Sequence, residues 1–94
     1  MIIGACTINL YLSGVHSLKE KRSIVKSILA RLRNEFNVSV AEVDAHDLHG
    51  RAVLGVACVS SSSDYARGQL EAVLRWIEQE RPDAPVIDYE IELL

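Results

Sequence analysis

The chain has 94 residues, and ten Lys and Arg against thirteen Asp and Glu give it a net charge of −3. This length allows a single domain over residues 1–94. No apolar run approaches the roughly 20 residues that cross a bilayer, and residues 1–3 lead into a strand-like pattern without a basic leader. We therefore expect a cytoplasmic protein with no membrane partner, and the negative net charge by itself disfavours nucleic acid as a partner.

Apolar and polar residues alternate over residues 2–12, which predicts a half-buried first strand. A helical period follows from Leu18 to Phe36, and Asn37 is expected to end this helix in a left-handed conformation. Two strands are expected over residues 38–43 and 51–60. Residues 44–50, here called the connector, are too many for a two-residue hairpin turn. Cys6 and Cys58 lie in apolar strand patterns, so we expect buried, reduced thiols.

Residues 60–64 offer N-caps for a second helix over residues 65–80, and two prolines follow it. The last strand is expected over residues 86–93, with four residues directed inward (Ile87, Tyr89, Ile91 and Leu93) and three outward (Asp88, Glu90 and Glu92). This order predicts an α+β fold, the ferredoxin-like βαββαβ sandwich, in which both helices cover one face of a four-stranded antiparallel sheet. The first and third strands are central in such a sheet.

The start of the first helix carries an unusual charge pattern. Ser17 and Glu20 have the spacing of a capping box. Lys19, Lys21 and Arg22 nevertheless occupy the first turn and a half, where each cation opposes the helix dipole at a cost of about 0.3–1 kcal/mol. This conflict predicts that an anion binds nearby.

Six of the ten basic residues fall between positions 19 and 33. On a helical wheel, four of them share one sector beside the apolar stripe: Lys19, Arg22, Lys26 and Arg33, here called the basic ridge. A row of cations beginning at a helix N-terminus is suited to phosphate. The predicted anion- or RNA-binding residues are therefore Ser17, Lys19, Lys21, Arg22, Lys26 and Arg33. A merely solvated helix face is the alternative interpretation.

The sequence argues against base stacking, metal binding and catalysis. The third predicted strand has no aromatic residue, so base stacking on the sheet, as in RRM domains, is not expected. The connector holds four possible metal ligands (Asp44, His46, Asp47 and His49), but one short loop does not close a coordination shell easily, and we expect no metal and no cofactor. Acylphosphatases place an Arg in the loop after the first strand, and residues 13–17 contain none. We therefore expect no catalytic residues and no enzyme, with an acylphosphatase-like hydrolase as a minor alternative.

The segments His16–Arg22 (HSLKEKR) and Phe36–Asp44 (FNVSVAEVD), with Asp47 and Arg51-Ala52 beyond them, resemble the YlxP-like family of small bacterial proteins. The likeness spans essentially the whole chain. The family is classed as a domain of unknown function with a ferredoxin-like fold, and many members are encoded beside translation factors and ribosome-maturation genes. The resemblance therefore implies a cytoplasmic role around the ribosome. His49 departs from the family pattern, because many relatives carry Trp there.

The sequence thus predicts a non-enzymatic, ribosome- or RNA-associated accessory domain whose partner is ribosomal RNA or a ribosome component. The alternative is a protein-interaction module that forms a homodimer through an edge strand or the open sheet face.

Overall fold

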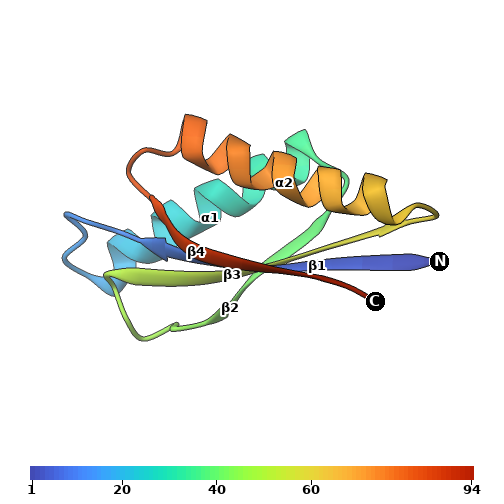
Figure 1. Cartoon of the computed structure of the whole chain (residues 1–94). Coiled ribbons are helices and arrows are strands. Elements are labelled where there is room, and N and C mark those ends of the chain that lie inside the picture. Colours follow the sequence, from blue (N-terminus) through green and yellow to red (C-terminus); the bar gives the residue numbers. More distant parts are fainter.

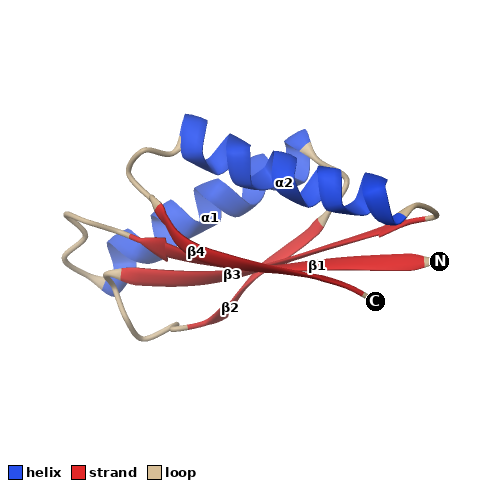
Figure 2. Cartoon of the chain, in the orientation of Figure 1, coloured by secondary structure: helices blue, strands red, loops and turns tan.

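The computed structural model describes all residues 1–94 and contains six elements. These are two helices and four strands: β1 (Ile2–Tyr11), α1 (Leu18–Glu35), β2 (Ser39–Asp44), β3 (Arg51–Ser60), α2 (Ser63–Glu80) and β4 (Val86–Leu93). Both helices lie on the same side of the sheet, and the opposite side carries no helix (Figures 1 and 2). The predicted ferredoxin-like α+β fold is confirmed.

The strands are ordered β2-β3-β1-β4, and every neighbouring pair is antiparallel. The first and third strands are therefore central, as predicted. The long central pair is in continuous register from Ile2 opposite Ser60 to Tyr11 opposite Arg51. This unbroken register fixes which side chains face the helices and which face away, because successive residues of a strand point to opposite faces.

The core lies between the helices and the inner sheet face. Cys6, Ile8 and Leu10 of β1 point into it, as do Val25 and Ile28 of α1. The helices contribute their apolar stripes at the expected 3.6-residue period, with α2 burying Ala66, Leu70, Val73, Leu74 and Ile77. The two cysteines are buried and unpaired, as expected. No helix of the chain is both long and apolar enough to cross a bilayer.

Two local predictions are wrong. The helix α1 ends at Glu35 with an extended Phe36 as its C-cap, and Asn37 does not adopt a positive φ; the only non-glycine residue that does is Ala45. In β4 the register shifts between Asn9 and Leu10, so that Leu10 pairs with Val86 rather than with Ile87. Ile87 is the extra residue of this bulge, and it is 54% exposed rather than directed into the core.

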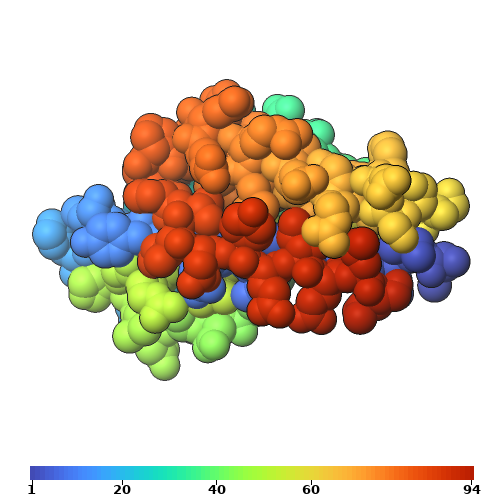
Figure 3. All heavy atoms as spheres, in the orientation of Figure 1, coloured from blue at the N-terminus to red at the C-terminus, as the bar shows by residue number.

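The end of α2 is tied to α1 by a single arginine. The Arg81 guanidinium donates to Ser27 Oγ of α1 at 3.0 Å and also holds Asp83 at 2.9 Å. This guanidinium keeps the pKa of the Asp83 carboxyl below its ordinary value. Beyond it the chain turns into β4, which forms the near edge of the molecule beneath α2 (Figure 3).

Candidate phosphate-binding surface on the first helix

The start of α1 is capped from both directions. Ser17 Oγ accepts the N–H of Glu20 at 3.1 Å, as the capping pattern predicts. The Glu20 carboxylate reaches back one residue further than expected and accepts the N–H of His16 at 3.4 Å. The N–H groups of Leu18 and Lys19 have no acceptor within the chain, so the positive end of the helix remains open.

Lys21 is the exception among the predicted site residues. Its side chain is 1% exposed, and its ammonium donates to Ala45 O at 2.5 Å and to Leu48 O at 2.6 Å. It also lies 2.9 Å from Glu42 Oε2. The ammonium is therefore enclosed by oxygen atoms of the chain, and the prediction that grouped Lys21 with the anion-binding residues is wrong.

Glu42 Oε2 depends on this lysine. The oxygen is buried and meets no partner in hydrogen-bond geometry, so its 2.9 Å ion contact with Lys21 is its only compensation. The contact is short enough for a direct charge–charge attraction even though its angle is poor for a hydrogen bond. Lys21 and Glu42 therefore form an ion pair in which each charge neutralises the other.

The connector folds around this pair. Ala45 O accepts both Lys21 and the N–H of Leu48, and Ala45 itself has φ 58°. Asp44 Oδ1 accepts the N–H of Ala45 at 2.7 Å, while the Nδ1–H of His49 donates to Val15 O at 2.9 Å. These bonds join the connector to the loop before α1, so the start of the helix is held by residues far away in the sequence.

The connector histidines are directed at backbone oxygens. His49 points to the loop before α1, and the Nε2–H of His46 donates to Glu42 O at 3.2 Å. No three His, Cys, Asp or Glu side chains lie close enough together to hold a metal ion. Arg51 binds Asn9 Oδ1 at 3.0 Å rather than pairing with Asp44 or Asp47.

The basic ridge lies on the exposed side of α1. Arg22, Lys26 and Arg33 line one groove of about 210 Å³, together with the apolar Val25 and Leu29. Glu42 forms the far wall, but its charge is already neutralised by Lys21. Lys19 is exposed one turn closer to the helix start. No carboxylate lies within ion-pair distance of any ridge cation.

The remaining arginines of α1 have local partners. Arg33 belongs to the ridge, but one guanidinium nitrogen donates to Val40 O of β2 at 3.0 Å, which fixes the side chain across the groove. Arg31 lies outside the ridge, 5.3 Å above the ring of Trp76 on α2, in a cation–π contact. Its charge is therefore directed toward the second helix.

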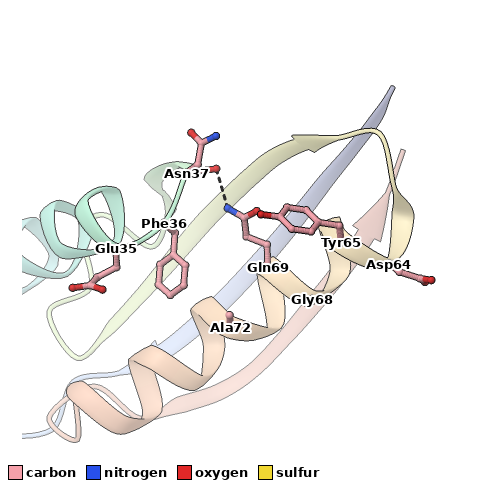
Figure 4. A pocket seen from close by; sticks show the side chains of 8 residues that line it. All are labelled: Glu35, Phe36, Asn37, Asp64, Tyr65, Gly68, Gln69 and Ala72. Carbon is pink, nitrogen blue, oxygen red and sulfur yellow. Dashed lines mark hydrogen bonds between the residues drawn. The ribbon is translucent and has the colours of Figure 1, made fainter.

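A larger hollow, of about 570 Å³, lies between the end of α1 and the first turns of α2 (Figure 4). Tyr65 and Gln69 of α2 face Phe36 and Asn37 across it, and Gln69 donates to Asn37 O at 3.1 Å. Its charged residues are Glu35 and Asp64, both acidic. This hollow is therefore unsuited to an anion, although it is larger than the groove of the ridge.

One sequence signal could have identified the role of Lys21. At 100° per residue, Lys21 falls in the same sector as Val25, Ile28 and Leu32, which are all buried. A lysine in the centre of an apolar stripe indicates a buried, paired ammonium rather than a surface charge. The partners cannot be read from the same pattern, because they come from β2 and the connector.

The fold and this surface define a ferredoxin-like α+β domain with an uncompensated basic face on its first helix. The chain belongs to the family described as "Protein of unknown function (DUF503)", whose model matches residues 3–91. It is also 45% identical over 62 residues to the uncharacterized protein YlxP of Bacillus subtilis (strain 168), a match that covers 66% of this chain and 67% of that protein. The family predicted from the sequence is confirmed.

Proposed function

We propose that this protein is a non-enzymatic, RNA-associated accessory domain that binds backbone phosphates through the basic ridge, with ribosomal RNA as its ligand. The observation that carries the proposal is the groove in which Arg22, Lys26 and Arg33 converge without a carboxylate partner. In an acidic protein, cations left uncompensated on one helix face produce a local positive potential that attracts anions.

Phosphate suits this groove better than a carboxylate ligand would. Two guanidinium groups can each donate two parallel hydrogen bonds to phosphate oxygens, and Lys26 adds a point charge between them. The free N–H groups at the start of α1 extend the same potential toward Lys19 and the Ser17 hydroxyl. The ridge therefore offers an anion several contacts along one line.

The basic ridge is suited to recognise the shape of an RNA rather than its base sequence. Contacts to phosphates position a protein on nucleic acid but carry no sequence information. The groove has no aromatic residue for base stacking, since its apolar members are Val25 and Leu29. We therefore expect binding to structured RNA with little preference among sequences.

The test is co-sedimentation of the full chain with bacterial ribosomes over a series of salt concentrations. If about four phosphates are contacted, log affinity falls with log salt at a slope of about −3. The triple variant Lys19→Glu, Arg22→Glu, Lys26→Glu should lose binding. Arg33 is left unchanged in this variant because its bond to Val40 O supports β2.

The matched control reverses three exposed arginines outside the ridge, with the substitutions Arg31→Glu on α1 and Arg67→Glu and Arg75→Glu on α2. This variant has the same net charge as the first but retains Lys19, Arg22 and Lys26, so it should still sediment with ribosomes. Unchanged binding of the ridge variant, or equal losses in both variants, would exclude the ridge as the binding site. Circular dichroism of both variants confirms that each is folded.

A further inference from the structure

The sheet face opposite the helices, here called the open face, has a regular composition from row to row. Antiparallel pairing aligns Glu92, Ala5, Ala57 and Ser39 across β4, β1, β3 and β2. The next row aligns Glu90, Thr7, Gly55 and Ala41. Each row thus begins with a carboxylate on β4 and continues with small side chains over the other three strands.

These small side chains form a shallow valley of about 320 Å³. Val43 follows Ser39 and Ala41 on this face by strand alternation and rises beside the valley. A Cβ atom added to Gly55 would lie only 2.8 Å from a Val43 methyl group, so glycine leaves room for this side chain. At the other end the valley continues into a hollow of about 390 Å³ lined by Ile3 and Val59. Val59 is 65% exposed, so apolar surface is left uncovered at this end.

The acidic side of the valley is unpaired. Asp88 accepts a hydrogen bond from Asn9 Nδ2 at 2.6 Å, and Asn9 in turn accepts from Arg51, so these three groups satisfy one another. Glu90 and Glu92 are exposed and have no cation within ion-pair distance. A partner with cations along one side would supply what these two carboxylates lack.

A second copy of this chain does not supply cations for Glu90 and Glu92. Two open faces packed together would bring four such glutamates into one interface, and the cation that each open face contributes is Arg51, already bonded to Asn9. Like charges without compensation disfavour that assembly. Charge complementarity therefore selects a basic partner over self-association.

We propose that the open face binds an amphipathic helix of another protein that has small or aliphatic residues on one face and Lys or Arg along one flank. A helix is about 10–12 Å wide, close to the separation of β2 from β1 across β3, two strand spacings of about 4.8 Å each. Glu90 and Glu92 are about 6.8 Å apart along β4, which matches cations at i and i+4 on a helix, about 6 Å apart. Binding would follow the helix-in-groove mode.

The test uses two synthetic peptides of about 18 residues, identical except for one flank, which carries Lys in the first and Glu in the second. Amide NMR spectra of the full chain should show the Lys peptide shifting β1 and β3 residues around Ala5 and Ala57. The variant Glu90→Lys, Glu92→Lys should bind the Lys peptide about tenfold more weakly and the Glu peptide correspondingly more tightly. The reciprocal gain distinguishes a docking site from a loss of folding.

The matched control is Glu71→Lys, Glu78→Lys, which makes the same change of net charge on α2. It should leave the affinity for both peptides within about twofold of the native chain. The proposal is overturned if the Lys peptide causes no shifts at millimolar concentration, if the shifts map to the helices, or if the control behaves like the β4 variant. It is also overturned if the free chain forms a dimer that buries Ala57.

Discussion

The ammonium nitrogen of Lys21 lies 2.9 Å from Oε2 of Glu42, and this pair joins the first turn and a half of α1 to the end of β2. Because the lysine also binds two connector carbonyls, one side chain holds three separate parts of the chain together. The segment that carries the anion-binding hypothesis is therefore also a structural junction. Mutations within it must be separated into those that affect the ridge and those that affect the junction.

Replacing Lys21 by Met should destabilise the protein by about 3–5 kcal/mol, the usual effect of removing one partner from a buried ion pair. The loss arises because Glu42 Oε2 keeps its buried charge, and two carbonyls lose their donor. Urea unfolding measures the change. Lys19→Met is the matched control, since Lys19 is exposed and unpaired, and loss of its charge from the first turn should at most stabilise the protein, by about 0.3–1 kcal/mol. Equal effects of the two substitutions would show that the pair contributes no more than a surface contact.

Replacing Ala45 by Gly in the connector should increase the stability of the protein. Ala45 has φ 58°, a conformation that costs a non-glycine residue about 1–2 kcal/mol. Glycine removes this strain but loses more conformational freedom on folding, which costs about 0.5–1 kcal/mol, so the net gain in stability should lie between zero and about 1.5 kcal/mol. Ala30→Gly, on an exposed position of α1, should instead lose about 1 kcal/mol. A loss for Ala45→Gly as large as that for Ala30→Gly would contradict the strain argument.

Much of this arrangement follows from local patterns in the sequence. The alternation over residues 2–12 and the 3.6-residue period of both helices predict the elements, because one face of each must be buried. The exposure of Ile87 could not be predicted, since the bulge that contains it depends on how β4 pairs with β1. The partners of Lys21 could not be predicted either, because they follow it by 21 to 27 residues and meet it only in the folded chain.

Lys19→Glu should raise the stability of the protein by about 0.3–1 kcal/mol, because it places an anion in the first turn of α1 where the dipole is positive. Lys19 has no ion pair to lose. Thermal unfolding at low salt measures the gain, which should shrink at 1 M salt, where the Debye length is about 3 Å. Lys26→Glu is the control, since it lies in the middle of the helix beyond the reach of the dipole. A lower stability for Lys19→Glu would mean that the native lysine has a stabilising partner.

The stability of the protein should fall as the pH rises above 9. Burial raises the pKa of the Cys6 thiol from 9.0 to about 11, against a smaller lowering effect of the Glu90 backbone. Below pH 9 the thiol is protonated in both the folded and the unfolded chain, so the full stabilisation is present. Between 9 and about 11 only the unfolded chain releases this proton, which favours unfolding. Urea unfolding from pH 8 to pH 10.5 measures the decline in stability, and Cys6→Ala should show a shallower decline.

The same burial of Cys6 should protect the native thiol from a disulfide reagent at pH 8, with reaction only after denaturation. Rapid labelling of Cys6 in the folded protein would contradict both this expectation and the expected pH dependence.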